Sequence, residues 1–221
     1  MKINSITVDS SSSITDLCKL GKMYPTDKSP YNIENYVTEH GSGHSHPYTA
    51  VYDMLFSQIR HRPIKFAELG ILDSMSMLMW RDYFPNATLF GYDNSSYFLQ
   101  KCESLKIPNC FLSEMDVLNE SSIEEGLSKY GKFDIILEDT THQFEDQIRV
   151  CEIAHRHLNP GGILIIEDIF RSTDESRYGE RLEKIAKYYS SIFFVKTEHL
   201  NRYSPGWDND KLLILIRNEY M

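Results

Sequence analysis

The chain has 221 residues, of which 41% are hydrophobic and 25% are charged, and its formal net charge at pH 7 is −9. This length and composition suit a globular protein with one buried core and an extension. The acidic balance argues against a nucleic-acid partner, because nucleic-acid binding favours a basic face.

The cysteines and the apolar segments narrow the class of protein further. Cys18, Cys102, Cys110 and Cys151 are scattered and form no C-x-x-C pair, which favours reduced thiols over a disulfide framework. Residues 1–13 show no basic segment followed by an apolar one, and no apolar run approaches the ~20 residues of a membrane span. We therefore expect a cytoplasmic protein without a membrane partner, and the sequence leaves a homo-oligomer open.

Residues 1–48 precede the first regular pattern and are predicted to form an N-terminal extension. Ser13 or Thr15 is a candidate N-cap for a short helix that ends near Gly21. Residues 22–48 contain prolines and glycines among many polar residues, so we expect a long ordered loop there. No strand is predicted in the extension.

Residues 49–221 are predicted to form the main domain, because strand and helix patterns alternate along it. A first helix is predicted over 49–60, where the apolar residues fall on one face. The predicted strands cover 65–69, 87–92, 110–115, 133–138, 163–167, 191–197 and 211–217. The predicted helices that follow cover 74–84, 95–105, 120–129, 143–158 and 177–189.

This alternation is typical of a parallel, doubly wound sheet. A polar turn, and not a helix, joins the last two predicted strands, so we expect them to pair as an antiparallel hairpin at one edge. We therefore predict an α/β fold with a Rossmann-like, doubly wound, seven-stranded sheet whose last strand is antiparallel.

The turn after the first predicted strand is where a doubly wound sheet binds a nucleotide. Glu68 and Gly70 end that strand and Ser74 begins the next helix. The pattern is E-x-G-x-x-x-S and lacks the G-x-G-x-x-G of pyrophosphate sites. An acidic strand end repels a pyrophosphate but attracts a cationic ligand. This favours S-adenosylmethionine, whose ammonium and sulfonium groups are positive, over NAD.

Two further acids end the next two predicted strands. Asp93 is placed to accept hydrogen bonds from ribose hydroxyls, and Asp116 is placed to reach the adenine amine. For each acid alone, a helix N-cap or a solvated turn is the alternative. Together with Glu68 they resemble the class I methyltransferase pattern, in which strand-end acids bind S-adenosylmethionine. The resemblance spans roughly residues 48–217, and Ser74 stands where many members have glycine.

Polar residues also follow two later runs of apolar β-formers. Asp139, Glu167 and Asp168 offer hard oxygen ligands suited to Mg²⁺, and Asp139 is also expected to touch the cofactor. His142 is a candidate general base, since a nearby divalent cation keeps an imidazole neutral. Methyl transfer to an alcohol needs such activation, because an alcohol is a poor nucleophile at pH 7.

The two motifs together resemble the metal-dependent sugar O-methyltransferases of macrolide biosynthesis, the macrocin and mycinamicin type. Those carry an Asp-Asp-Gly-Ser-His turn and a later Ile-Glu-Asp strand end. Here residues 138–142 are Glu-Asp-Thr-Thr-His and residues 166–168 are Ile-Glu-Asp. The resemblance implies that Asp139, Glu167 and Asp168 hold the metal. It also implies that His142 is the base and that the acceptor is a sugar hydroxyl.

Segments of the extension resemble the same family. Thr26-Asp27-Lys28 resembles its Gly-Thr-Asp-Lys segment, with Pro25 in place of glycine, and Tyr48 begins a counterpart of its Tyr-Thr-Pro segment. The resemblance implies that the extension lies against the active site. Thr26 and Lys28 are then expected at the cofactor, and Asp27 and Tyr48 at the substrate. An exposed turn is the alternative.

Other residues with chemical potential have plainer interpretations. His40, His44 and His46 lie in a polar loop that contains glycine, and we interpret them as loop histidines and not as a metal cluster. Trp80 falls within a predicted helix and is assigned to the core. Trp207 falls in a turn and is the better candidate for a substrate contact.

The leading hypothesis is an S-adenosylmethionine-dependent O-methyltransferase that methylates a sugar hydroxyl of a monosaccharide or glycan. The alternatives are an O-methyltransferase for a catechol-like or other small metabolite, an NAD-dependent oxidoreductase, and a non-catalytic methyltransferase-like binding module. The missing second glycine after Gly70 disfavours NAD. The complete set of acids around His142 disfavours a module without catalysis.

Overall fold

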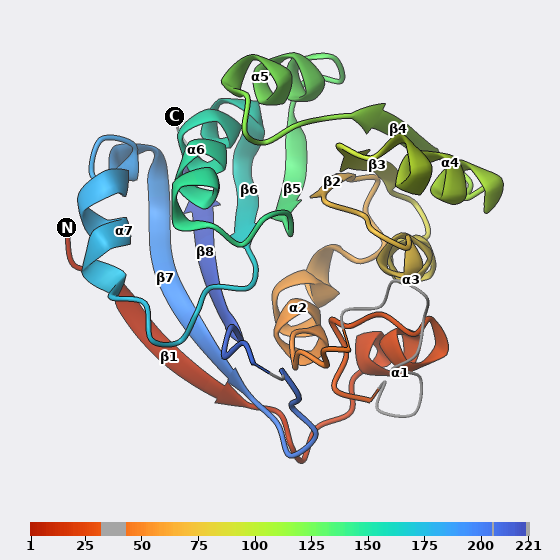
Figure 1. Cartoon of the computed structure of the whole chain (residues 1–221), viewed down its shortest axis with the longest axis horizontal. Helices are drawn as coiled ribbons and strands as arrows, with labels where there is room; N and C mark the ends of the chain where they lie inside the picture. Colours follow the sequence, from red (N-terminus) through yellow and green to blue (C-terminus); the bar gives the residue numbers. More distant parts are fainter. Residues whose placement is uncertain (32–42, 205, 220–221) are drawn as a thin grey trace.

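The computed structural model describes residues 1–31, 43–204 and 206–219, which fold around one eight-stranded sheet (Figure 1). The strands are β1 (Asn4–Asp9), β2 (Lys65–Leu69), β3 (Thr88–Asp93), β4 (Cys110–Glu114), β5 (Phe133–Glu138), β6 (Leu158–Ile166), β7 (Tyr189–Glu198) and β8 (Lys211–Arg217). Their order across the sheet is β1-β7-β8-β6-β5-β2-β3-β4, so β1 and β4 lie at its two ends.

Helices cover both faces of the sheet. They are α1 (Asp16–Met23), α2 (Thr49–Phe56), α3 (Met75–Tyr83), α4 (Ser96–Ser104), α5 (Glu120–Ser128), α6 (Phe144–Ala154) and α7 (Glu175–Leu182). The second, sixth and seventh are followed by the short 3-10 turns Ser57–Ile59, His155–His157 and Ala186–Tyr188. Helices α5, α6 and α7 share one buried apolar cluster, and α1, α2, α3 and α4 share a second. The predicted doubly wound α/β fold is confirmed.

Strand β8 is the exception to a parallel sheet. It pairs antiparallel with both of its neighbours, β6 and β7. The other pairings of the named strands are parallel. The predicted reversal of the last strand is therefore confirmed.

The predicted count of seven strands is wrong, because Asn4–Asp9 forms β1 and pairs in parallel with β7. Five of the six residues of β1 are exposed, so the strand has no buried apolar face that a sequence pattern would reveal. Its placement depends on backbone pairing with β7, as is usual for a strand at the edge of a sheet. The β7–β8 hairpin consequently lies inside the sheet and not at its edge.

The extension folds back over the main domain through a short helix and a turn. Thr15 caps α1 as predicted, since its Oγ1 accepts a hydrogen bond from the Cys18 N–H at 3.2 Å, and the helix continues to Met23. A Cβ atom at Gly21 would lie 2.6 Å from the Ser29 Cβ, so only glycine lets the turn after the helix pack this closely. That packing directs the chain between Thr26 and Ser29 into the interior.

The register of the central strands brings their carboxyl ends to one level. Leu69 of β2 pairs with Tyr92 of β3 and with Glu138 of β5, and Glu138 pairs with Ile166 of β6. The residues that follow these strands therefore meet at one edge, which is where open α/β sheets bind ligands. Within the described ranges, none of the helices combines the length and the apolar character that crossing a bilayer demands.

Candidate active site

A cavity of about 470 Å³ lies at this edge of the sheet. It is lined by loops that follow β2, β3, β4, β5 and β6, by the extension and by the β7–β8 turn. The lining residues are Asp27, His44, Leu69, Gly70, Leu72, Tyr92, Asp93, Asn94, Phe98, Met115, Val117, Asp139, Thr140, Thr141, His142, Asp168, Trp207 and Asn209.

Gly70 is required where β2 and β5 end side by side. Its φ is +86°, and a Cβ atom there would lie 2.0 Å from the Asp139 carbonyl oxygen. We expected this glycine to allow close approach of a ligand. Gly70 lines the cavity, and the close approach that the structure shows is to the neighbouring loop, so Gly70 fixes where Asp139 stands at the cavity wall.

Asp93 lines the cavity and also fastens the first turn. Its Oδ2 accepts hydrogen bonds from the N–H groups of Ile71 and Leu72 at 3.1 and 3.2 Å. Its Oδ1 accepts from the Ser95 N–H at 2.9 Å. The carboxylate thus shapes the turn that leads from β2 to α3, besides facing the space where a cofactor ribose was predicted.

Three other residues predicted at the cofactor stand back from the cavity. Ser74 is buried with φ +69° and precedes α3. Asp116 accepts a hydrogen bond from the Leu118 N–H at 3.0 Å, while its neighbours Met115 and Val117 line the cavity. The turn that we considered as the alternative for Asp116 is therefore present.

Glu68, the third, is fully buried beneath the cavity. Trp80 Nε1 donates to its Oε2 at 2.9 Å, and Lys28 Nζ lies 3.5 Å from its Oε1. Burial is the main cause that raises the pKa of Glu68 to about 7, against the opposing charge of Lys28. Trp80 itself packs among buried aromatic rings, as its assignment to the core predicted.

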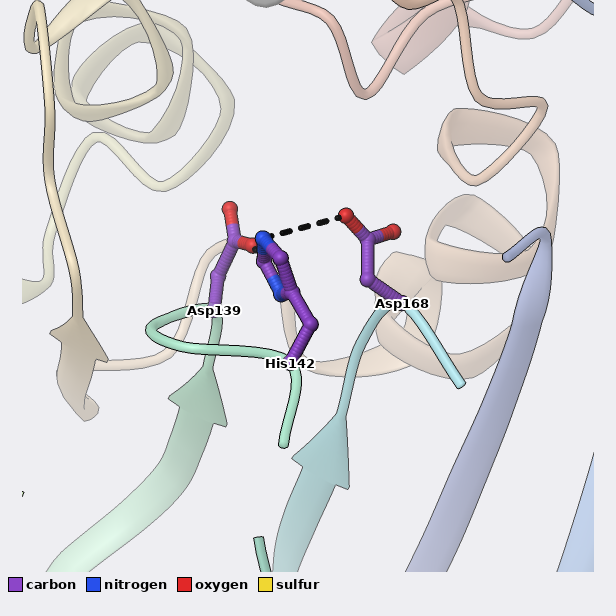
Figure 2. A group of neighbouring side chains, drawn as sticks. All are labelled: Asp139, His142 and Asp168. Atoms are coloured by element: carbon purple, nitrogen blue, oxygen red, sulfur yellow. Dashed lines mark ion pairs between the residues drawn. The ribbon is translucent and has the colours of Figure 1, made fainter. Parts of the chain in front are cut away.

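The loops after β5 and β6 meet, as expected from their strand-end motifs (Figure 2). Asp139, His142 and Asp168 each offer a ligand atom, and these atoms lie within 4.8 Å of one another. His142 Nε2 lies 3.7 Å from Asp168 Oδ2, and His142 Nδ1 lies 3.9 Å from Asp139 Oδ1. Figure 2 shows the three side chains converging from the two loops.

Two of these residues have a left-handed backbone conformation, which residues other than glycine rarely adopt. The φ angle is +58° at His142 and +57° at Asp168. Each such angle costs of order 1–3 kcal/mol and persists only where the surroundings impose it. The sharp turns direct the imidazole and the carboxylate into the same cavity.

Glu167 points away from this group, into the interior. Its Oε2 accepts a hydrogen bond from Lys28 Nζ at 2.8 Å, and its Oε1 accepts from the Tyr52 hydroxyl. Lys28 Nζ also donates to Asp139 Oδ2. Burial by itself would lower the pKa of Lys28, but Asp139, Glu167 and Glu68 raise it well above its usual range.

Residues of the extension lie at and behind the cavity wall. Asp27 lines the cavity, and Thr26 is buried in the turn that presents Lys28. Tyr48 is buried behind Asp168, where its hydroxyl donates to Oδ1 at 2.6 Å and lies 3.0 Å from the Asn209 carbonyl oxygen. Tyr48 therefore contacts an acid of the site and not the open cavity.

The histidine-containing loop holds a residue whose importance the sequence did not reveal. His46 is buried against Asp168 and Asp210, where these acids raise its pKa to about 9 although burial alone would lower it. His44 lines the cavity, and His40 lies outside the described residues. The one signal in the sequence that could have indicated a place for His46 near the site is that it lies two residues before Tyr48.

Trp207 lines the cavity and belongs to the turn between β7 and β8. Its side chain stacks on Phe170 with ring centroids 5.6 Å apart, and its residue is 41% exposed. The His142 ring lies 6.2 Å away and perpendicular to it. An exposed aromatic surface thus stands next to the candidate base.

Comparison with known proteins agrees with this arrangement. A family model described as a methyltransferase domain matches residues 74–214. The 8-demethyl-8-(2-methoxy-alpha-L-rhamnosyl)-tetracenomycin-C 3'-O-methyltransferase of Streptomyces olivaceus is 28% identical over 185 residues, which are 76% of this chain and 44% of the relative. Mycinamicin VI 2''-O-methyltransferase of Micromonospora griseorubida is 26% identical over 136 residues, or 58% of this chain and 33% of the relative. The chain therefore spans less than half the length of these curated relatives.

Solved structures show the same fold. The MycE methyltransferase from the mycinamycin biosynthetic pathway, in complex with Mg and SAH, covers 94% of this chain with a TM-score of 0.67 and 18% identity. This chain covers 56% of that protein. The resemblance drawn from the strand-end motifs is confirmed by these comparisons.

Proposed function

The chain belongs to the methyltransferase domain family, and we propose that it transfers a methyl group from S-adenosylmethionine to a hydroxyl of a sugar, either free or within a glycoside. The observation that carries the proposal is the meeting of Asp139, His142 and Asp168 in one cavity with Gly70 and Asp93. The relatives named as O-methyltransferases of rhamnosyl and mycinamicin compounds support a sugar acceptor.

The cofactor is proposed to lie along the ends of β2, β3 and β4. Asp93 offers its carboxylate to the ribose, and the apolar side chains of Phe98, Met115 and Val117 offer a surface to the adenine. The acids at this edge suit a ligand with ammonium and sulfonium groups. Glu68, Ser74 and Asp116 stand back from the cavity and are proposed to support the ends of β2 and β4 without touching the cofactor.

A divalent cation, with Mg²⁺ as the first choice, fits the acids of the cavity. Asp139 and Asp168 supply hard oxygen ligands, and the buried Nδ1 of His142 lacks a hydrogen-bond partner among the described residues. Glu167 joins these ligands only if its carboxylate leaves Lys28 and Tyr52. When bound, the cation would lower the pKa of the acceptor hydroxyl and orient it.

His142 is proposed to accept the proton of the acceptor hydroxyl. Its ring lies between Asp139 and Asp168, whose carboxylates stabilise the imidazolium that proton transfer creates. Trp207 is proposed to stack on the acceptor sugar, because its exposed ring stands beside His142. Asp27 is proposed to contact the same acceptor.

We also propose that residues 1–48 act as a part of the active site and residues 49–221 as the cofactor-binding domain. Lys28 and Tyr48 come from the extension and hydrogen-bond to Asp139 and Asp168 of the main domain. A protein without the extension is expected to lose the arrangement of these two carboxylates.

The test is methyl transfer by the purified chain. It is incubated with S-adenosylmethionine and Mg²⁺ and with a panel of glycosides, monosaccharides and catechols, and methylated product and S-adenosylhomocysteine are measured by mass spectrometry. We expect methylated glycosides, loss of the product with EDTA, and recovery when excess Mg²⁺ is added. Full activity in EDTA would remove the cation from the proposal.

The same experiment separates the alternatives. Methylation of catechols alone would favour a small-metabolite O-methyltransferase. Calorimetric binding of NADH without binding of S-adenosylmethionine would favour an oxidoreductase. Binding of S-adenosylmethionine without transfer to any acceptor of the panel would favour a binding module.

A further inference from the structure

His46 is a buried histidine with one ring nitrogen firmly paired. Its Nδ1 lies 2.7 Å from Asp210 Oδ1, and its side chain is 3% exposed. Arg202 Nη1 donates to the other oxygen of Asp210 at 2.6 Å. Asp210 is thus held through both of its oxygens, and its contact with Nδ1 fixes the orientation of the His46 ring.

The second nitrogen of His46 faces the site. His46 Nε2 lies 3.6 Å from Asp168 Oδ1 and has no hydrogen-bond partner within the described residues. The ring thus places this nitrogen beside the Asp168 oxygen that does not face His142. A chain of contacts thus runs from Arg202 through Asp210 and His46 to Asp168.

Tyr48 also contacts Asp168 Oδ1, the oxygen that lies near His46. The Tyr48 and His46 rings stack with centroids 5.0 Å apart and planes 6° apart. The Tyr48 hydroxyl donates to Asp168 Oδ1 at 2.6 Å. Tyr48 therefore holds Oδ1 by a hydrogen bond and the stacked His46 ring stands beside it, while Oδ2 is the oxygen that faces His142 at 3.7 Å.

We propose that His46 is a positioning residue that, together with Tyr48, holds Asp168 Oδ1 so that Oδ2 faces the cavity as a cation ligand. This inference rests on the proposed function, because it assigns His46 a role at the proposed cation site. Partners of metal-binding carboxylates typically change metal affinity 10- to 100-fold when they are removed. His46 is therefore expected to set the affinity for the cation without touching it.

Two substitutions separate the nitrogens of the ring. In H46N the amide nitrogen can take the place of Nδ1 and keep the bond to Asp210, but nothing replaces Nε2. In H46Q the longer side chain brings its amide nitrogen to the place of Nε2, beside Asp168. The matched pair H155N and H155Q changes a buried histidine that stacks on Tyr188, away from the cavity.

The experiment measures the dissociation constant for Mn²⁺ as a probe of the cation site, by the electron paramagnetic resonance of the free ion, with melting temperature recorded for each variant. We expect H46N to bind Mn²⁺ roughly 10- to 100-fold more weakly than the unmodified chain. We expect H46Q to recover most of the affinity, and both His155 variants to bind normally.

Mn²⁺ binding by H46N at the affinity of the unmodified chain would overturn the inference and leave the proposed function standing. Equal weakening in H46N and H46Q, in proportion to lost thermal stability, would also overturn it, because a purely structural role does not distinguish the nitrogens. Absence of Mn²⁺ binding by the unmodified chain would instead contradict the proposed cation site itself.

Discussion

Lys28 and Glu167 are 139 positions apart in the sequence and form an ion pair beneath the cavity, with Nζ 2.8 Å from Oε2. Both side chains are 2% exposed. Lys28 also contacts Asp139 and Glu68, so one ammonium group lies against three acids at the ends of three strands. The extension thus supplies the charge on which the arrangement of the acids depends.

Replacing Lys28 by methionine is expected to destabilise the fold strongly. Removing one partner of a buried ion pair leaves an uncompensated charge, which costs about 3–5 kcal/mol. Urea unfolding followed by circular dichroism measures the free energy of unfolding. In the double variant K28M/E167Q, part of the loss should be recovered, because the second substitution removes one unpaired carboxylate.

The control for Lys28 is K19M. Lys19 pairs with Asp16 at 2.9 Å, but its side chain is 66% exposed, so this substitution should cost less than about 1 kcal/mol. Equal losses in K28M and K19M would mean that the buried ammonium does not hold the acids together.

The sequence predicted the edge of the sheet where the site lies, because that edge follows from apolar strands that end in acids. Asp139 and Asp168 both follow such strands, and the parallel register, which pairs Glu138 with Ile166, brings them to the same edge of the sheet. The direction of each side chain was not predictable in the same way. Glu167 and Asp168 are neighbours, yet one points to Lys28 and the other, with φ +57°, to the cavity.

Contacts made by the extension were also beyond the reach of sequence patterns. Five of the six residues of β1 are exposed, so no apolar face marks this strand in the sequence. His46 lies in a polar loop without helical or strand periodicity. Both are placed by partners distant in sequence, β7 for the strand and Asp210 for the histidine. Only the resemblance of Thr26-Asp27-Lys28 to a known segment indicated that the extension reaches the site.

Alanine at position 70 is expected to destabilise the protein by roughly 2–4 kcal/mol, since a left-handed φ and an overpacked site both carry a cost. Its Cβ would displace the Asp139 backbone, so Mn²⁺ affinity should fall together with stability. Chemical unfolding and Mn²⁺ titration measure the two effects.

Gly131 provides the matched control for Gly70. Its φ is +84°, almost the same, but the nearest atom to an added Cβ is the end of the Lys65 side chain at 3.9 Å. G131A should therefore show only the backbone cost, about 1 kcal/mol, and normal Mn²⁺ affinity. A G70A protein that matches G131A in both measurements would contradict the proposed contact with Asp139.

The raised pKa of Glu68 leads us to expect that the stability of the fold depends on pH. Its pKa in the folded chain is about 7, above the 4.5 of an ordinary glutamic acid, mainly because the carboxyl is buried. The folded state therefore binds the proton more tightly than the unfolded state, and this group's contribution to stability is lost as pH rises from 4.5 to 7. The loss is of order 3 kcal/mol, at about 1.4 kcal/mol for each pKa unit.

Glutamine at position 68 carries no such titration. Relative to the unmodified chain, E68Q should therefore be more stable at pH 8 than at pH 4.5, that is, the difference in the free energy of unfolding should shift in favour of folded E68Q as pH rises. The matched substitution E114Q changes an exposed acid at the end of β4, and its effect should be small at both values. An E68Q effect that is the same at both pH values would show that Glu68 titrates normally in the folded chain.

His142 is expected to act on the rate of methyl transfer and not on cofactor binding. Its ring lies between Asp139 and Asp168, whereas the proposed cofactor surface is formed by Asp93 and Met115. Loss of a general base lowers a rate about 10²- to 10⁴-fold. H142A should therefore lose turnover to this extent while calorimetry gives an unchanged dissociation constant for S-adenosylhomocysteine.

H157A is the control, because His157 lies in the 3-10 turn after α6 and pairs with Glu124 away from the cavity. It should keep both turnover and cofactor binding. If H142A lost cofactor binding and turnover by the same factor, the imidazole would be part of the cofactor site and the proton would need another acceptor. Because the His142 ring also belongs to the group of possible cation ligands, a rate that falls while the dissociation constants for both S-adenosylhomocysteine and Mn²⁺ stay unchanged is the result that supports His142 as the group that takes the proton.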